Sequence, residues 1–328
     1  MPPTEPVSRV QKAILEAYGI EGSLRRLPGE NLNYLVESDG GKKFVVKLAD
    51  EHGPGGVVEM EFMALKHAEQ ANPGIQFPSI IENKFGNYET LVKFSSNDHK
   101  LLRILNYIGG TDLTEHTDIS EELRFDIGKT LASFDQSMAG FDHPAAHRMH
   151  RWDLAKAEQH EARISLVNDP EKRQLLAWAF NQFTKNVSPV LSSLPWQFIH
   201  GDANPENIRV AKDKVVGLLD FGDNCFNPLV CDLAICLAYQ MMEHEDPCQP
   251  ARVLVSGFQS VRPLSDTERS VLLPLVCTRL AVTLSVVAER RQIDSGNTNW
   301  FVSEAPAWKL LSTLFSLPAG RFEEVVFR

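Results

Sequence analysis

The sequence lacks cysteine pairs at the short spacing that structural zinc sites require. Its five cysteines are an odd number, and each lies several residues or more from the next: Cys225, Cys231, Cys236, Cys248 and Cys277. We therefore expect buried or free thiols at these positions and no zinc site.

The sequence also lacks an excess of basic residues. Lysine and arginine together number 33 against 43 aspartates and glutamates, which gives a formal net charge of -10. A surface of this charge repels phosphate backbones and anionic lipid headgroups. We therefore expect neither a nucleic acid nor a membrane surface as a partner.

Long uncharged stretches are missing as well. Residues 1–9 do not show the basic and then apolar order of a secretory signal, and no stretch reaches the roughly 20 uncharged apolar residues of a membrane-spanning helix. We expect a cytoplasmic protein that is a monomer or a homodimer. At 328 residues, of which 43% are hydrophobic, the chain is long enough for two lobes.

Helix-like and strand-like patterns alternate over the first hundred residues. The Ser-Asp-Gly-Gly turn at 38–41 separates two strand candidates, which predicts an antiparallel hairpin. The spacing of apolar residues predicts helices over 7–18 and 57–70, and strands over 33–37, 43–48, 77–82, 88–94 and 101–108.

The rest of the chain is mostly helical in pattern after Gly109 and Gly110, which predict a connection between lobes. Ser120 is a suitable N-cap for a helix over 121–138. Further helices are expected over 152–166, 171–187 and 228–242. We predict an α+β chain with an N-lobe at 1–106, built on an antiparallel sheet with helices, and a mostly helical C-lobe at 107–328.

Polar residues follow apolar, strand-like runs between residues 197 and 223. Asp202 and Asn207 come after one such run, and Asp220 comes after the next. Phosphoryl transfer needs a group that orients a hydroxyl and accepts its proton, and oxygen ligands that hold a divalent metal against the nucleotide phosphates. The kinase template places Asp, Asn and Asp in this order. We therefore predict Asp202 as the catalytic base, and Asn207 and Asp220 as ligands of Mg²⁺ or Mn²⁺.

A resemblance to the aminoglycoside phosphotransferase and choline kinase superfamily rests on His-Gly-Asp at 200–202, Asn207, and Asp-Phe-Gly-Asp at 220–223. Protein kinases usually carry Arg where Gly201 stands, so the glycine points to the small-molecule branch. The resemblance implies a bilobal protein-kinase-like fold, ATP or GTP as phosphate donor, and the hydroxyl of a metabolite or drug as acceptor.

A looser similarity to hydroxylysine kinases extends over residues 217–223, 232–234, 237–239 and 303–308. It implies transfer to the side-chain hydroxyl of 5-hydroxylysine or a related amino alcohol. Homoserine, choline and aminoglycoside acceptors stay open as alternatives. The rival of a different class is a kinase-shaped sensor that binds a nucleotide or metabolite without turnover, although every catalytic position holds a competent residue.

Contacts to the donor nucleotide are expected from the N-lobe. Lys47 occupies the strand position from which a kinase lysine reaches the α- and β-phosphates, and a carboxylate of the next helix should pair with it. Glu61 is preferred because its neighbours set a buried face, and Glu59 stays open. The turn that covers the phosphates carries no glycine-rich motif, so Asn31 or Asn33 is expected to contact them. The nucleotide site also includes the residues that connect the lobes: Asn106, Tyr107 and Ile108.

The remaining candidates belong to the C-lobe and to the acceptor. Asp223 either approaches the metal or caps the next helix. Asp232 lies in an apolar helix, so it either braces the catalytic loop or meets a substrate ammonium group. By charge complementarity, Arg279 is assigned to an acceptor carboxylate and Glu304 to an acceptor ammonium group. His200 is expected to brace the loop backbone without meeting substrate.

Overall fold

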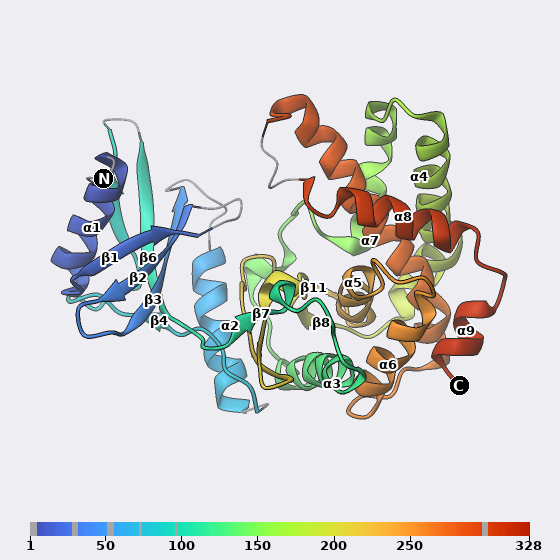
Figure 1. Cartoon of the computed structure of the whole chain (residues 1–328), viewed down its shortest axis with the longest axis horizontal. Coiled ribbons are helices and arrows are strands. Elements are labelled where there is room, and N and C mark those ends of the chain that lie inside the picture. Colours follow the sequence, from blue (N-terminus) through green and yellow to red (C-terminus); the bar gives the residue numbers. More distant parts are fainter. Residues whose placement is uncertain (1–4, 28–31, 51–55, 72–73, 96–97, 297–300) are drawn as a thin grey trace. The chain divides into compact units, whose positions relative to one another are not determined.

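The protein is described here by a computed structural model that covers residues 5–27, 32–50, 56–71, 74–95, 98–296 and 301–328. Its contacts divide the chain into two compact units. The first unit comprises Met1–Leu65 and Phe77–Ile108, and the second comprises Lys66–Gln76 and Gly109–Arg328. Helix α2 therefore contributes residues to both units (Figure 1).

The first unit is built on an antiparallel sheet. Its strands follow the order β1-β2-β3-β6-β4, and β5 also pairs with β6. The predicted hairpin is present, because Glu37 at the end of β2 lies opposite Lys43 at the start of β3. The elements are α1 (Glu5–Tyr18), β1 (Gly22–Arg26), β2 (Leu32–Ser38), β3 (Lys43–Asp50), α2 (Val57–Ala71), β4 (Ile80–Ile81), β5 (Thr90–Lys93) and β6 (His99–Asn106).

Helix α1 packs its apolar face on this sheet. Val10 and Ile14 are one helical turn apart, and both are buried in a cluster with Val46 of β3 and Ile104 of β6. A spacing of four residues places two side chains on the same face of a helix. The apolar side of helix α1 therefore covers the face of the sheet that carries Val46 and Ile104.

The second unit is mostly helical and holds three small strand pairings. Strand β9 lies between β7 and β10, and β8 pairs with β11. Its longer elements are α3 (Glu121–Ser137), α4 (Pro170–Gln182), α5 (Val230–Gln240), α6 (Cys248–Gln259), α7 (Asp266–Ile293), α8 (Glu304–Phe315) and α9 (Arg321–Val326). The strands are β7 (Thr111–Asp112), β8 (Trp196–Ile199), β9 (Ile208–Ala211), β10 (Lys214–Leu218) and β11 (Cys225–Pro228).

Helix α7 runs through the middle of the second unit. It packs against α4, α5 and α8 (Figure 1). Its length and apolar composition would suffice to cross a membrane, but 89% of its most apolar stretch is buried inside the protein. The central helix of a helical core has this character, because apolar neighbours surround it on all sides.

Two of the predicted helices differ from regular α-helix. The segment predicted over 152–166 is a 3₁₀ helix, Leu154–Leu166, with a non-helical residue at Lys156. The helix predicted over 171–187 is α-helical over Pro170–Gln182 and continues as a π-helical turn over Phe183–Val187. The other predicted helices agree closely, and Ser120 caps α3 by accepting a hydrogen bond from the Leu123 N–H. The prediction of buried or free thiols is confirmed for all five cysteines.

Candidate active site

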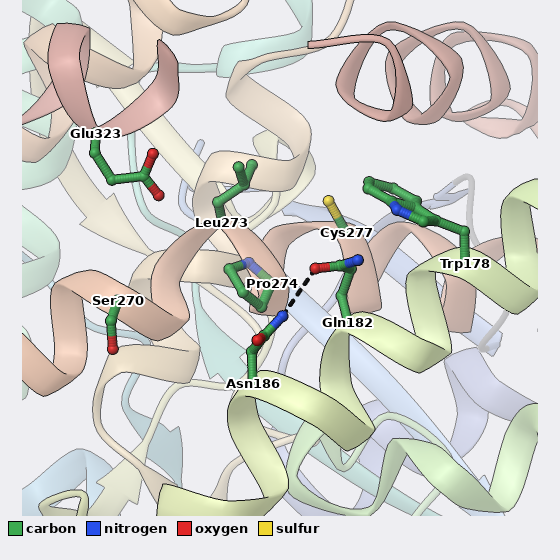
Figure 2. A pocket seen from close by; sticks show the side chains of 8 residues that line it. All are labelled: Trp178, Gln182, Asn186, Ser270, Leu273, Pro274, Cys277 and Glu323. Carbon is green, nitrogen blue, oxygen red and sulfur yellow. Dashed lines mark hydrogen bonds between the residues drawn. The ribbon is translucent and has the colours of Figure 1, made fainter. Parts of the chain in front are cut away.

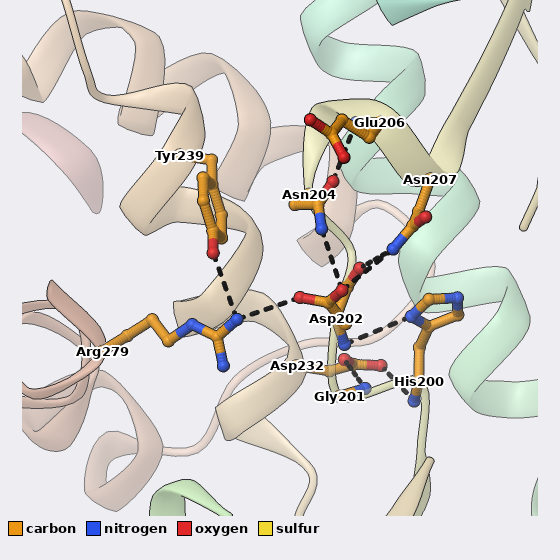
Figure 3. A network of polar contacts seen from close by, with 9 residues as sticks. All are labelled: His200, Gly201, Asp202, Asn204, Glu206, Asn207, Asp232, Tyr239 and Arg279. Atoms are coloured by element: carbon orange, nitrogen blue, oxygen red, sulfur yellow. Dashed lines mark hydrogen bonds and ion pairs between the residues drawn. The ribbon is translucent and has the colours of Figure 1, made fainter. Parts of the chain in front are cut away.

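The loop between β8 and β9 presents Asp202. One carboxylate oxygen, Oδ2, accepts hydrogen bonds from the side-chain amides of Asn204 (2.9 Å) and Asn207 (3.0 Å). The other, Oδ1, accepts one from Arg279 of α7 (2.9 Å), as Figure 3 shows. The carboxylate is thus held at both oxygens, and its side chain keeps 19% of its surface exposed.

Burial raises the pKa of Asp202 to about 7, although the charge of Arg279 opposes the shift. Asp223 and Asp220 lie close enough to raise the pKa further through charge repulsion. A carboxylate whose pKa lies near neutrality is suited to accept a proton from a reacting hydroxyl. The environment of Asp202 therefore fits the role that the sequence predicts for it.

Asp232 of α5 binds the backbone of this loop through hydrogen bonds. Its two oxygens accept the N–H groups of His200 (2.9 Å) and Gly201 (2.8 Å), and the side chain is fully buried (Figure 3). His200 bonds the Leu219 carbonyl through Nε2 (2.9 Å) and accepts the Asp202 N–H at Nδ1 (3.3 Å). Of the two roles left open for Asp232, the geometry supports the brace and not the substrate contact. His200 also lies where a bracing residue should.

A second buried carboxyl group, Asp135 of α3, was not found from the sequence. It is 1% exposed, and neither of its oxygens has a hydrogen-bond donor among the described residues. Burial, and then the charge of Asp232, raise the pKa of Asp135 well above its ordinary value. One sequence signal exists, because Asp135 follows Leu131 by four residues and so lies on the apolar face of α3.

Asn207 and Asp220 offer oxygen ligands of the kind that Mg²⁺ prefers. The amide nitrogen of Asn207 donates to Asp202, which leaves its carbonyl oxygen for a cation. The Leu219 N–H donates to the backbone carbonyl oxygen of Asn207 (2.8 Å), which brings Asp220 beside the loop and leaves the side-chain Oδ1 of Asn207 out of this bond. Within the described residues, no group of three or more His, Cys, Asp or Glu residues could hold a metal. Two protein ligands suit a Mg²⁺ ion that takes its other oxygens from phosphates and water.

The backbone of Asp220 is unusual, because its φ of 60° lies in the left-handed region. A non-glycine residue pays a conformational cost there, and such residues cluster at functional sites. Asp223 follows shortly after and precedes β11, which separates it from the first residue of α5, Val230. The capping alternative for Asp223 is therefore not supported, whereas its closeness to Asp202 is.

Arg279 lies almost fully inside the protein, at 2% exposure, and its Nη2 bridges Asp202 and the Tyr239 hydroxyl (3.2 Å). Its guanidinium carbon lies 5.0 Å from the ring centre of Trp152 and 5.7 Å from that of Tyr239. Glu304, at the start of α8, is ion-paired with Arg291. The assignment of Glu304 to an acceptor ammonium group stays a prediction.

The first unit holds the residues predicted for the nucleotide. Lys47 Nζ lies 3.6 Å from Glu61 Oε1, so the preferred partner Glu61 pairs with this lysine. Glu61 is 1% exposed and also forms an ion pair with Arg103, which the sequence did not indicate. Arg103 lies directly opposite Lys47 on the neighbouring strand β6. A carboxylate that pairs with two cations is held in position by both, and so it fixes the position of the lysine.

The other nucleotide candidates are placed as follows. Asn33 lies opposite Lys47 on β2, and its side-chain oxygen is buried without a donor among the described residues. Asn31 lies outside the described residues. Asn106 ends β6, and its side-chain oxygen accepts hydrogen bonds from both the backbone and the hydroxyl of Ser79. The Lys43 ammonium lies 5.9 Å from the ring centre of Tyr107, and Ile108 is buried. Their contacts to a nucleotide stay predictions.

A separate cavity of about 260 Å³ lies in the second unit, and Figure 2 shows the side chains that line it. Cys277 of α7 faces this cavity. Residues two positions apart on a helix point to roughly opposite sides, so Arg279 points away from the cavity. The lining contains no residue of the predicted site: Trp178, Gln182, Asn186, Ser270, Leu273, Pro274, Cys277 and Glu323. We assign this cavity no part in the chemistry.

Comparison with known proteins agrees with this geometry. The profile of the phosphotransferase enzyme family (APH) matches residues 23–266, which is more than half of the chain. The chain belongs to this phosphotransferase family. It is therefore a small-molecule kinase that acts on hydroxyl groups.

Relatives of this phosphotransferase include a hydroxylysine kinase of Mus musculus, which is 30% identical over 271 residues, or 77% of this chain and 72% of the relative. A homoserine kinase of Gluconobacter oxydans (strain 621H) is 27% identical over 290 residues, or 85% of this chain and 86% of the relative. The solved structure of an amicoumacin kinase in complex with AMP-PNP and Ca²⁺ matches with a TM-score of 0.71 at 15% identity and covers 98% of both chains. The predicted bilobal protein-kinase-like α+β fold is thereby confirmed.

Proposed function

We propose that this phosphotransferase transfers the γ-phosphoryl group of ATP or GTP to the side-chain hydroxyl of 5-hydroxylysine or a similar hydroxy-amino acid. The observation that carries the proposal is Asp202, which is held at both oxygens, partly exposed, and raised in pKa toward neutrality. A general base must be fixed in position and have a pKa near the working pH. The similarity to a hydroxylysine kinase supports the choice of acceptor.

In this proposal Asp202 accepts a hydrogen bond from the acceptor hydroxyl and takes its proton as the oxygen attacks the γ-phosphorus. The bond between the γ-phosphorus and the β-phosphate oxygen breaks, and the nucleoside diphosphate leaves. The bonds from Asn204, Asn207 and Arg279 limit the rotation of the carboxylate, so little reorganisation is needed when substrate arrives. Asp232 and His200 keep the loop backbone in place, because they bind its N–H groups.

Lys47 is proposed to contact the α- and β-phosphates, with Glu61, which is itself ion-paired with Arg103, holding it in position. Asn207 and Asp220 would hold Mg²⁺ or Mn²⁺, which neutralises charge on the phosphates when bound. The turn that includes Asn31 and Asn33, and the connection at Asn106, Tyr107 and Ile108, complete the proposed nucleotide contacts. We propose a cytoplasmic location.

Homoserine is the second candidate acceptor, because a homoserine kinase aligns over most of both chains. A sensor without turnover is the rival of another class. Incubation with ATP or GTP and Mg²⁺ across 5-hydroxylysine, homoserine, ethanolamine, choline and an aminoglycoside separates these possibilities. We expect a phosphorylated product with 5-hydroxylysine. Nucleotide binding without turnover of any acceptor would favour the sensor.

The substitution Asp202→Asn tests the base directly. The amide keeps the size of the side chain but cannot take the proton, so kcat should fall by about 10²- to 10⁴-fold while nucleotide affinity changes little. Steady-state kinetics and nucleotide titration measure the two quantities. Asp213→Asn is the matched control, because Asp213 is exposed in the turn between β9 and β10. A variant that keeps its kcat and loses only nucleotide affinity would make Asp202 a binding residue.

A further inference from the structure

Arg279 has more donors than the protein uses. Nη2 is bound by Asp202 and Tyr239, but Nε and Nη1 are buried and have no hydrogen-bond partner among the described residues. Figure 3 shows Nη1 on the side of the guanidinium away from both partners. Buried donors normally have a partner, because desolvation without one costs stability. Two buried, unpartnered donors of a guanidinium beside a predicted catalytic base indicate a ligand group that belongs there.

His150 has the same property and lies near Arg279. Both of its ring nitrogens are buried without a partner among the described residues. Burial, and then the charge of Arg148, lower the pKa of His150 to about 4, with Arg279 and Lys156 acting in the same direction. The ring is therefore neutral and offers one donor and one acceptor.

The charges around these two side chains favour an anion. Around His150 the cationic side chains of Arg148, Arg279 and Lys156 outnumber the one carboxylate, Asp153, that acts on it. The ring centre of Trp152 lies 5.0 Å from the guanidinium carbon of Arg279 and 5.6 Å from that of Arg290. Stacking against rigid rings fixes the plane of a guanidinium and so prepares it for a planar anion.

We propose that Arg279, with His150 near it, binds the carboxylate of the acceptor, so that this kinase selects amino acids over amino alcohols. The inference rests on the proposed function, because it needs the acceptor hydroxyl at Asp202. Arg279 donates to Asp202 through Nη2, so a carboxylate at Nη1 lies within a short carbon chain of that hydroxyl. Hydroxylysine and homoserine have a hydroxyl and a carboxylate separated by such a chain, whereas choline and ethanolamine have no carboxylate.

Two pairs of acceptors test this assignment. 5-Hydroxylysine is compared with 1,5-diaminopentan-2-ol, and homoserine with 3-aminopropan-1-ol, because the members of each pair differ only by the carboxylate. A site built to bind a polar substrate group rejects the analogue that lacks it by up to about 10⁴- to 10⁵-fold. For the wild-type enzyme we expect kcat/KM for the better amino acid to exceed that of its partner by at least about 100-fold.

The variant Arg279→Met separates recognition from a merely structural role. Arg279 contacts Asp202, so both members of a pair should lose activity, but the ratio of their kcat/KM values should fall to within about tenfold of one. Arg279→Lys should restore part of the ratio, because it keeps the charge without the planar fork. Arg252→Met, on the exposed side of α6, is the control and should leave the ratio unchanged. If Arg279→Met does not fold, Tyr239→Phe serves instead and should lower the ratio by raising KM for the amino acid.

The outcomes are distinguishable. Equal turnover of both members of a pair by the wild-type enzyme overturns the carboxylate site and leaves the proposed kinase function standing. An unchanged ratio in Arg279→Met or Tyr239→Phe, with both acceptors slowed alike, limits Arg279 to positioning Asp202 and also overturns the assignment. Absence of turnover with every hydroxylated acceptor contradicts the proposed function itself.

Discussion

Gly201 stands between the bracing His200 and the predicted base Asp202, and only glycine fits its conformation. Its φ of 77° is in the left-handed region, and a Cβ atom there would lie 2.8 Å from the Asp223 carbonyl oxygen. Both the backbone angle and the close approach therefore exclude a side chain. This explains in structural terms why the motif has glycine at a position where protein kinases usually carry arginine.

The substitution Gly201→Ala should displace the catalytic loop. Because a backbone oxygen blocks the new methyl group, the loop must move, and we expect kcat/KM to fall by about ten- to hundredfold. Steady-state kinetics with the best acceptor measures the change. Gly140→Ala is the matched control, since Gly140 has a φ of 78° but open space around its Cβ. It should cost about 1–2 kcal/mol of stability and little activity. Equal kinetic effects in the two variants would contradict the role of the close approach.

Helices α3 and α6 approach each other more closely than side chains would allow. A Cβ on Gly128 of α3 would lie 2.0 Å from the Leu254 carbonyl oxygen, and a Cβ on Gly257 of α6 would lie 2.0 Å from that of Phe125. Each helix thus places a glycine against the backbone of the other. Helix α3 also carries Asp135, whose pKa is affected by the charge of Asp232.

At the scale of elements, we predict that Gly257→Ala destabilises the protein. An alanine inside a helix normally gains up to about 1 kcal/mol over glycine, but overpacking at this contact should reverse the sign and cost about 1–3 kcal/mol. Urea unfolding monitored by circular dichroism gives the change in midpoint. Ser256→Ala is the neighbouring control, because Ser256 is exposed on the same helix. A stabilised Gly257→Ala would show that the helices can separate without cost.

The sequence predicted poorly those elements in which apolar residues do not recur at a regular spacing. Strand β1 is mostly exposed and contains Gly22, Arg25 and Arg26, which are not typical of a strand; it exists because it pairs with β2 along its whole length. The 3₁₀ geometry of Leu154–Leu166 was not predicted either. This segment is interrupted at the non-helical Lys156, and the spacing of its apolar residues did not indicate the break.

Buried carboxyl groups should give the whole molecule a pH-dependent stability. Asp135 has its pKa raised well above the ordinary value, chiefly by burial. Below its ordinary pKa of about 3.9 the group is protonated in both the folded and the unfolded chain. As pH rises, the unfolded chain releases the proton while the folded protein keeps it. The free energy of unfolding should therefore fall until pH passes the raised pKa.

The substitution Asp135→Asn should remove this part of the pH dependence. The wild-type protein is expected to lose up to about 1.4 kcal/mol per pH unit through Asp135, and the variant should lose correspondingly less between about pH 5 and pH 8. Urea unfolding across that range measures both slopes. Glu122→Gln on the exposed side of the same helix is the control and should keep the wild-type slope. Parallel slopes for Asp135→Asn and the wild-type protein would show that Asp135 is ionised in the folded state.

The sequence by itself determined the class of fold and the predicted chemical centre, because both depend on local order along the chain. Asp202 and Asn207 are five residues apart in one loop, and their side chains meet there. The hairpin, the helix of Glu61 and the capped helix α3 likewise follow from local periodicity and turn residues.

Only the tertiary structure decided which distant side chains complete the site. Arg279 reaches Asp202 from 77 residues away, Asp232 binds the loop from 32 residues away, and Arg103 joins Glu61 from 42 residues away. The shifted pKa values of Asp135 and His150 arise from burial beside other charged groups, which the sequence does not show. Residues so far apart in the chain meet only when the helices pack, and the desolvation that shifts a pKa or leaves a donor without a partner exists only in the packed core.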